Sequence, residues 1–397
     1  MTVHDDAVAM AGDLVELRRT LHRHPEIGLN LPMTQERVLG ALDGLPLEIT
    51  TGRSLTSVVG VLRGGRPGPT VLLRGDMDAL PVTEQVDVDY RSEDDATMHA
   101  CGHDLHTTML VGAAELLSAR REELTGDVVF MFQPGEEGWD GAGYMIEEGV
   151  LDVAGERPAA AYAIHVASSM WPRGMFVTRP GPMMAASDGL TVRVKGAGGH
   201  GSAPHRANDP VPAACEMVLA LQTMLTRRID AFDVAVITVG SFHAGTKANV
   251  IPEDATFDAT IRTFDSAVRD RIRSSAVRMC EGIAAAHGLE VDANYKTEYP
   301  LTVNDGTEAA FAGEVAAELF GADRFAEMER PLTGSEDFSR VIEAVPGAML
   351  FLGATPPDRD PSVAPNNHSP HAAFDDAVLA DGAALYAELA LRRMARG

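Results

Sequence analysis

The sequence predicts an α/β protein in which a mixed, largely parallel sheet is flanked by helices and interrupted by an inserted α+β domain. Strand-like apolar runs alternate with helices at first, the pattern changes near residue 187, and the first pattern resumes after Pro300. Strands that alternate with helices are typical of parallel sheets. We therefore expect a discontinuous domain of residues 1–186 and 302–397, with residues 187–301 inserted.

The elements of the first domain follow from the spacing of apolar residues. Leu14, Leu17 and Leu21 share one helical face and predict an amphipathic helix from about Val8 to Arg23. Short apolar runs bounded by Gly and Pro predict strands. The further expected strands are Ser57–Leu62, Thr70–Leu73, Asp127–Phe132 and Ala159–Val166, and the further helices are His106–Glu122 and Ala142–Glu148.

The insertion has the β-α-β-β-α-β order of a small ferredoxin-like sandwich. Its strands alternate apolar and polar residues, which indicates that one face of the sheet is buried. In chain order we expect strand Leu190–Lys195, helix Asp209–Thr226, strands Val234–Gly240 and Thr256–Arg262, helix Ser266–His287 and strand Glu290–Thr297.

The charge balance excludes some classes of partner. Acidic residues outnumber basic ones 58 to 33, and the formal net charge of −25 disfavours nucleic acid and anionic lipid. The sequence has no apolar run long enough for a transmembrane helix, and its acidic beginning is unlike a secretory signal. Its 3 cysteines are odd in number, which argues against a disulfide framework. We expect a soluble, cytoplasmic protein.

The densest polar segment is Met98–His106, which contains a Cys-x-His pair at Cys101 and His103. On an extended loop, residues two apart can both face one ion. A thiolate and an imidazole are good ligands for zinc, manganese, cobalt or nickel. Taken alone, the pair fits a metal site and a polar surface loop equally well, because short metal motifs also match by chance.

Two adjacent carboxylates, Glu136 and Glu137, follow the apolar run that ends at Phe132. Open α/β sheets bind ligands beyond the carboxyl ends of their parallel strands. Adjacent residues on an irregular loop point in different directions. One carboxylate can therefore bind metal while its neighbour serves as general base.

Other polar residues end neighbouring strands or lie in late loops. Asp76 and Asp78 follow a strand, where a carboxylate could orient a metal-bound histidine or merely cap a turn. His165 ends another apolar strand, and His368 lies in a polar loop. Each is explained as easily by structure as by function, but together they favour a site at one edge of the sheet.

Several motifs occur together in the order found in one family. They are Leu17–Glu26, Met98–His106, Phe132–Gly138, Gly199–His205, Asn249–Pro252 and Gly334–Phe338. On these motifs the chain resembles, over nearly its whole length, the amidohydrolase branch of the cocatalytic metallopeptidases. That branch contains hippurate hydrolases, bacterial N-acyl-amino-acid amidohydrolases and plant auxin-conjugate hydrolases. The resemblance implies metal-dependent hydrolysis of the amide bond of an N-acyl amino acid.

The resemblance also implies roles for individual residues. Glu136 would be the general base, and Asp78 would lie near the metals. Two divalent ions (Mn²⁺, Zn²⁺, Co²⁺ or Ni²⁺) would be held by Cys101, His103, Glu137, His165 and His368.

The inserted domain would act as a lid and would form a homodimer or a higher homo-oligomer. In related enzymes the histidine that matches His200 reaches into the partner's active site and helps to stabilise the oxyanion. Asn249 and Arg262 stand where the resemblance suggests that a substrate carboxylate could dock. Their structural alternatives are a strand-end turn and a solvated strand face.

Three other functions stay open at this point. A dipeptidase or aminoacyl-peptide hydrolase would use the same mechanism. A thiol hydrolase would use Cys101 activated by His103, which leaves the Glu136-Glu137 pair without a role. A metal-dependent binding protein would have the fold without the turnover.

Overall fold

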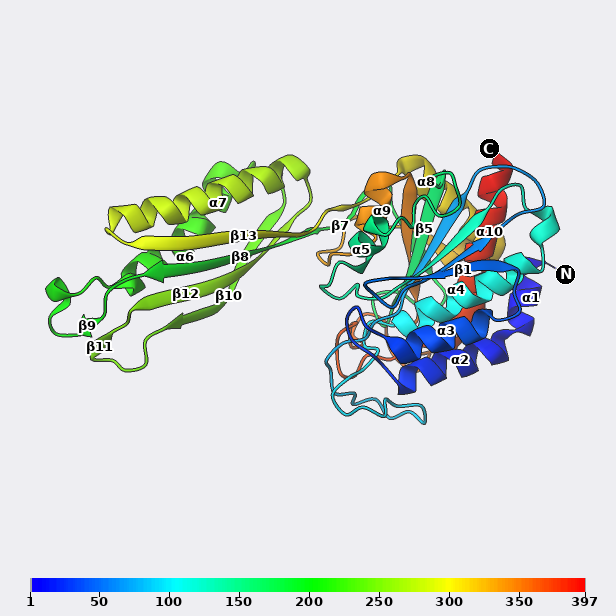
Figure 1. Cartoon of the computed structure of the whole chain (residues 1–397), viewed down its shortest axis with the longest axis horizontal. Coiled ribbons are helices and arrows are strands. Elements are labelled where there is room, and N and C mark those ends of the chain that lie inside the picture. The colour runs from blue at the N-terminus through cyan, green and yellow to red at the C-terminus, as the bar shows by residue number, and fades with distance from the viewer. Residues whose placement is uncertain (1, 397) are drawn as a thin grey trace. The chain divides into compact units, whose positions relative to one another are not determined.

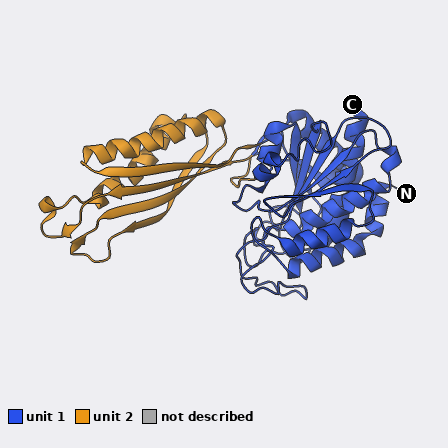
Figure 2. Ribbon diagram, in the orientation of Figure 1, with its two compact units in different colours: residues 1–183, 303–330, 337–397 blue, residues 184–302, 331–336 orange. Residues whose placement is uncertain are grey.

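The computed structural model describes residues 2–396 and divides into two compact units (Figures 1 and 2). Unit 1 comprises Met1–Met183, Val303–Arg330 and Asp337–Gly397. Unit 2 comprises Met184–Thr302 and Pro331–Glu336. Unit 1 is thus discontinuous in sequence, and unit 2 is inserted into it.

An eight-stranded sheet forms the centre of unit 1, and it confirms the predicted fold class. Strands β3, β4 and β5 run parallel, as do β5 and β16, whereas β1 and β2 are antiparallel to their neighbours. In spatial order the strands are β1 (Leu47–Thr51), β2 (Val58–Leu62), β4 (Val128–Gln133), β3 (Val71–Asp76), β5 (Ala160–Ala167), β16 (Gly347–Gly353), β6 (Phe176–Thr178) and β15 (Phe325–Glu327).

Helices pack against this sheet around one apolar core. Helices α4 and α10 contact each other and strand β3, and α5 and α9 contact each other and strands β4 and β16 respectively. No helix within residues 2–396 is both long and apolar enough to cross a bilayer. The helices of unit 1 are α1 (Val3–Ala9), α2 (Ala11–Arg23), α3 (Pro32–Leu42), α4 (His103–Ser118), α5 (Gly141–Glu147), α8 (Gly306–Phe320), α9 (Ser339–Ala344) and α10 (Leu379–Arg396).

The central strands of unit 1 are apolar because both of their faces are covered. Every residue of β2, β3, β4, β5 and β16 is buried. Such runs show no polar alternation, as is usual for parallel strands between helical layers. Polar side chains can therefore reach solvent only where these strands end.

Unit 2 is the ferredoxin-like sandwich that the sequence predicts. Its antiparallel sheet has the order β10 (Ala235–Ala244), β12 (Asp254–Thr263), β8 (Ala186–Lys195) and β13 (Glu290–Tyr299). Helices α6 (Pro210–Arg228) and α7 (Ser266–Ala286) begin at aspartates that cap them, Asp209 and Asp265. Their apolar residues pack with the sheet in a core of their own. Two short pairs, β9 (Gly199–His200) with β11 (Val250–Ile251) and β7 (Gly181–Met184) with β14 (Thr302–Asn304), complete the strands.

Three expected boundaries differ from the structure. The helix expected from Val8 is two helices, since a capping box at Thr2 starts α1 and a second helix follows Met10. Helix α4 begins at His103 rather than His106, directly after Gly102, whose φ of 84° is left-handed. Residues 331–336 group with unit 2, because Ala185 N donates to carbonyl oxygens of that segment.

Candidate metal centre

The predicted polar clusters meet at one edge of the unit 1 sheet. Strands β3, β4 and β5 are parallel neighbours, so their carboxyl ends lie at the same edge. Asp76 at the end of β3 stands opposite Gln133 at the end of β4. Beyond these ends come Asp78 and the Glu136-Glu137 pair, and His165 lies near the end of β5.

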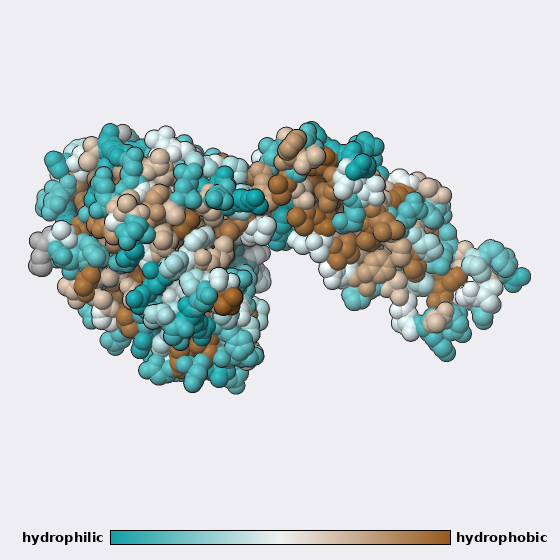
Figure 3. All heavy atoms as spheres, turned by 180° about the vertical axis from the view of Figure 1, so that it is seen from behind, coloured by the Kyte–Doolittle hydropathy of each residue, from teal (hydrophilic) through white to brown (hydrophobic). Residues whose placement is uncertain are grey.

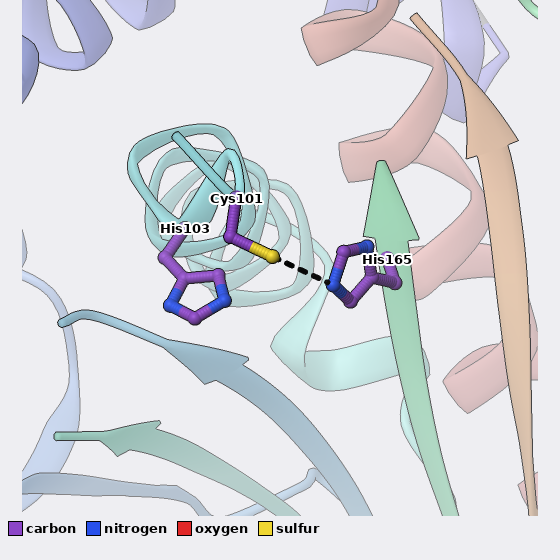
Figure 4. Close-up of side chains that lie close together, drawn as sticks. All are labelled: Cys101, His103 and His165. Atoms are coloured by element: carbon purple, nitrogen blue, oxygen red, sulfur yellow. Dashed lines mark hydrogen bonds between the residues drawn. The ribbon is translucent and has the colours of Figure 1, made fainter. Parts of the chain in front are cut away.

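Cys101, His103 and His165 come together from the start of α4 and the end of β5 (Figure 4). Cys101 Sγ lies 3.4 Å from His165 Nε2. His165 Nδ1 lies 2.8 Å from the backbone oxygen of Val166, so it carries the proton and donates it there. This tautomer leaves Nε2 of His165 as the nitrogen with a lone pair for an ion.

Glu137 and His368 complete the ring of candidate ligands. His368 Nε2 lies 3.1 Å from Glu137 Oε1, and His103 Nε2 lies 4.0 Å from the same oxygen. His368 has φ = 72°, and its backbone N–H donates to Ala100 O at 2.8 Å. A non-glycine residue in this region is uncommon, and strain of this kind gathers at functional sites.

Asn367 ties the loop of His368 to the other two ligand segments. Its side-chain amide donates to the backbone oxygens of Cys101 and Val166, at 3.1 and 3.0 Å. Its amide oxygen accepts from Ser168 N at 2.9 Å. Asn367 thus holds three segments from distant parts of the chain in one arrangement.

Asp78 fixes the loop that carries the two glutamates. Its carboxylate oxygens accept from the backbone N–H groups of Glu136 and Glu137, at 2.9 and 3.0 Å. One of the same oxygens lies 3.4 Å from His103 Nδ1. Asp78 therefore contacts both the candidate ligand His103 and the backbone of Glu136, the candidate general base. A residue that orients metal ligands is expected in this position.

The pKa values of the histidines differ because their surroundings differ. Burial and the neighbouring His106 hold the pKa of His165 well below its usual value, so this imidazole is neutral. Burial also opposes charge on His103, but Asp76 and Cys101 outweigh it and raise its pKa. Hydrogen bonds to Cys101 and Glu137 raise the pKa of His368 to about 10. Protons therefore compete with cations for these sites.

The donor set fits divalent metal ions. Among residues 2–396, the buried polar atoms without a hydrogen-bond partner include both ring nitrogens of His103 and Oε1 of Glu137. Buried polar atoms are normally paired, so an imidazole and a carboxylate oxygen without hydrogen bonds call for a ligand. Among the described residues, five groups have donor atoms within 4.8 Å of one another. Three consist of the candidate ligands and the candidate base: Cys101 with His103 and His165, Cys101 with Glu137 and His368, and His103 with Glu136 and Glu137. The other two are Asp76 with His103 and His106, and Glu136 with Glu336 and Asp337. Thiolate, imidazole and carboxylate groups are suitable ligands for zinc and other divalent first-row transition metals.

The other three candidate residues belong to unit 2. His200 is exposed, and its Nδ1 lies 2.8 Å from Ser202 Oγ. Asn249 is exposed too, and its backbone oxygen accepts from Gly201 N at 2.9 Å. Asn249 lies next to Val250, the residue that pairs with His200 between β11 and β9. Arg262 lies on β12 opposite Ser187, so it stands apart from that pair in unit 2. Their roles stay predictions.

Comparison with known proteins identifies the family. The family model described as peptidase family M20/M25/M40 matches residues 72–392. The chain belongs to this family. It is 39% identical to thermostable carboxypeptidase 2 of Saccharolobus solfataricus, over 96% of this chain and 95% of the relative. It is 36% identical to hippurate hydrolase of Campylobacter jejuni, over 99% of each chain.

A solved structure agrees with the assignment. A dinuclear metal-binding peptidase of the M20 family from Bacillus subtilis is similar with a TM-score of 0.82 and 33% identity, covering 98% of this chain and 99% of that one. Family membership makes the M20 chain a metallo-amidohydrolase and weighs against a thiol hydrolase built on Cys101.

Sequence reasoning gave no place in the M20 metal site to His106 and Arg74, and for Asp76 it left open the orientation of a histidine or the capping of a turn. Asp76 Oδ1 lies 2.5 Å from His106 Nδ1, and its Oδ2 lies 3.6 Å from His103 Nε2. Arg74 Nη1 donates to Asp76 Oδ2 at 2.5 Å. A charged residue inside an otherwise apolar strand was the available signal for Arg74, since a buried charge needs a partner.

Proposed function

We propose that this M20 enzyme hydrolyses the amide bond of N-acyl amino acids, with two divalent metal ions (Mn²⁺, Zn²⁺, Co²⁺ or Ni²⁺) held by Cys101, His103, Glu137, His165 and His368. The observation that carries the proposal is the pair of hydrogen bonds from Glu136 N and Glu137 N to Asp78. They fix two adjacent carboxylates, of which Glu137 faces the histidine ligands. Glu136, 6% exposed, is then the second carboxylate of the same loop, available for proton transfer.

The chain's own residues carry the proton and the charge. Bound cations would supply Lewis acidity and a lowered pKa for the attacking water. Glu136 accepts the proton of that water and passes it to the leaving amine. His200 donates to the oxyanion, as one preorganised donor of an oxyanion hole. Arg262 and Asn249 hold the carboxylate of the amino acid, the arginine through paired hydrogen bonds.

We further propose that the enzyme works as a homodimer, or a higher homo-oligomer, joined through unit 2. Strand β10 is an edge strand, and long unprotected edges invite pairing with another chain. Apolar side chains are exposed on this unit, among them Leu219, Phe232, Val234 and Val236. Figure 3 shows apolar surface gathered on this part of the chain. A second copy that covers such a surface would remove it from water.

A dipeptidase or carboxypeptidase activity is the second candidate. The relative named a carboxypeptidase supports it, and the relative named a hippurate hydrolase supports the first. The chemistry is the same in both, so only the group on the acyl side differs. A free ammonium on that group would distinguish a peptide from an N-acyl amino acid.

A substrate panel tests the proposal. Metal-stripped enzyme receives manganese, zinc, cobalt or nickel singly, and release of amino acid is measured from N-acetyl and N-benzoyl amino acids and from matched dipeptides. We expect metal-dependent release from the N-acyl series. Faster release from the dipeptides would favour the second candidate, and no release from protein that binds two ions per chain would overturn both.

A further inference from the structure

A buried carboxylate outside the predicted ligand set, Asp337, holds both ends of the catalytic loop. Asp337 is fully buried just before α9. Its oxygens accept from Gln133 Nε2 at 2.8 and 2.7 Å, and one of them accepts from Ala142 N at 2.9 Å. Gln133 is the last residue of β4, and Ala142 lies in the first turn of α5. The loop between these two residues carries Glu136 and Glu137.

The same carboxylate is connected to the histidines through buried side chains. Arg74 Nη2 donates to Asp337 Oδ1 at 2.9 Å, and Arg74 Nη1 donates to Asp76. Asp76 Oδ1 accepts from His106 Nδ1. His106 Nε2 in turn accepts from Val166 N at 2.8 Å, which fixes the strand end beside His165. One network thus reaches both the glutamate loop and the imidazole side of the site.

Backbone pairing alone does not require this network. Strands β3 and β4 are already joined by their ladder, in which Asp76 stands opposite Gln133. The side chains of the network restrain what lies beyond the paired backbone of β3 and β4. These parts are the carboxylate of Asp76 and the loop after Gln133. Outer hydrogen bonds of this kind orient ligands and are worth about 10- to 100-fold in metal affinity or activity.

The charges in the network depend on one another. Arg74 lies between two carboxylates, and all three side chains are at most 2% exposed. Removal of one member of a buried charge network leaves the others uncompensated. Asp76 joins the two halves of the network, since its carboxylate accepts from Arg74 Nη1 and from His106 Nδ1.

We propose that Asp337 is a positioning residue of the metal site, which acts through Gln133, Arg74 and Asp76 on the candidate ligands. This proposal rests on the metal site of the proposed function and on no assumption about the substrate. Asp337 lies outside the predicted ligand set, although its donor atom is within 4.8 Å of one of Glu136. In this proposal it restrains the loop that carries Glu137 and, through Arg74 and Asp76, the surroundings of His103.

Cobalt binding to Asp337→Asn tests the proposal with a readout that needs no turnover. Metal-stripped enzyme is titrated with Co²⁺ while its visible absorption is recorded, and the melting temperature is measured with and without Co²⁺. We expect cooperative melting, an altered cobalt spectrum and about 10- to 100-fold weaker Co²⁺ binding.

Glu308→Gln is the matched control, since Glu308 is also a buried carboxylate in unit 1, paired with Arg393 at 2.9 Å. We expect this variant to lose stability while its Co²⁺ affinity and cobalt spectrum stay within twofold of the parent, a margin of about 0.4 kcal/mol. If Asp337→Asn behaved like Glu308→Gln, Asp337 would be only structural and the proposal would fall.

A compensating variant separates positioning from general damage. In Gln133→Glu/Asp337→Asn the carboxylate and the amide exchange places, so Arg74 Nε still meets an acceptor at residue 133, as it now does at 2.8 Å. We expect this variant to recover most of the Co²⁺ affinity. If Asp337→Asn does not fold, Gln133→Met at similar volume removes the bonds of Gln133 to Asp337 and to Arg74, while those of Asp337 to Arg74 and Ala142 remain. Parent-like Co²⁺ binding by that variant would overturn the proposal. Because no substrate is used, failure here differs from failure of the substrate panel.

Discussion

Apart from the exposed His368, the candidate residues of unit 1 are held more tightly than His200 and Asn249 of unit 2. Cys101, His103 and His165 are buried, and backbone hydrogen bonds fix the segments that carry them. His200 and Asn249 are exposed on short strands and turns of unit 2. A rigid shell preorganises a metal site within one chain, whereas exposed groups act only on what is brought to them. Unit 1 should therefore bind metal unaided, and unit 2 should matter only in turnover.

The largest expected effect comes from the adjacent glutamates, which differ in role although they share one loop. Glu136→Gln keeps shape and hydrogen bonding but cannot take a proton. We expect two ions per chain to remain bound and kcat to fall by about 10²- to 10⁴-fold. Glu137→Ala removes a ligand, so we expect metal itself to be lost. Metal content by mass spectrometry and kcat on the best N-acyl amino acid check both.

Glu136→Gln is the control for Glu137→Ala, because it should lose turnover while its metal content stays that of the parent. If Glu136→Gln retained normal turnover, the assignment of the general base would be wrong. If Glu137→Ala bound two ions with unchanged affinity, the ligand assignment would be wrong instead.

The next effect belongs to unit 2. His200→Ala should leave Co²⁺ binding unchanged and lower kcat by about 10²- to 10³-fold, the usual cost of one oxyanion donor. The check is the steady-state rate with the metal content measured on the same sample. Reduced metal binding in this variant would break the contrast between the two units.

Mixing variants sharpens the contrast, since the family resemblance implies that His200 serves the partner's site. Equal amounts of inactive Glu136→Gln and His200→Ala subunits are unfolded or dissociated together and allowed to pair at random. About one quarter of the parent activity should return, because half of the dimers then hold one complete site. No recovery from samples shown to contain mixed dimers would mean that His200 acts within its own chain.

A smaller effect is expected at Arg262, whose Nη1 donates to Thr260 Oγ1 at 2.6 Å on the same strand. Loss of a hydrogen bond to a charged group costs about 1.5–3 kcal/mol, so Arg262→Ala should raise KM roughly 10- to 100-fold with little change in kcat. Arg193→Ala is the control, since Arg193 pairs with Asp254 on the exposed sheet surface at 2.6 Å. Equal KM values for the two variants would remove Arg262 from the substrate site.

The sequence predicted the parts of the molecule that local patterns determine. Apolar runs followed by polar residues predicted the strand ends where Glu136, Glu137 and His165 stand, because parallel strands share one edge. The ligand set implied by the family resemblance supplied His368, whose loop has no periodic pattern. The ferredoxin-like order of unit 2 followed from the alternation of its strands.

Long-range side-chain contacts could not be predicted in this way. Asp76 and Asp78 stand two residues apart in one motif, yet the first bonds Arg74 and His106 while the second holds the glutamate loop. Asp337 belongs to a motif that was noticed but given no role, because its partners Gln133 and Arg74 are 204 and 263 positions away. Only tertiary packing decides such pairs.

The smallest expected effect is at Asn249, where the proposed donor is neutral. A neutral hydrogen bond contributes about 0.5–1.5 kcal/mol, so Asn249→Ala should raise KM roughly 2- to 10-fold without a change in kcat or Co²⁺ binding. Kinetics on one N-acyl amino acid at saturating metal measures this effect.

A charged substitution at this position tests whether Asn249 contacts the substrate carboxylate. Asn249→Asp places an anion where Ala leaves only a gap, and like charges repel at short range. Asn249→Asp should therefore raise KM more than Asn249→Ala for an N-acyl amino acid, but equally for the corresponding N-acyl amine, which has no carboxylate. If the two variants matched on both substrates, Asn249 would contribute to the turn that precedes β11 and not to recognition.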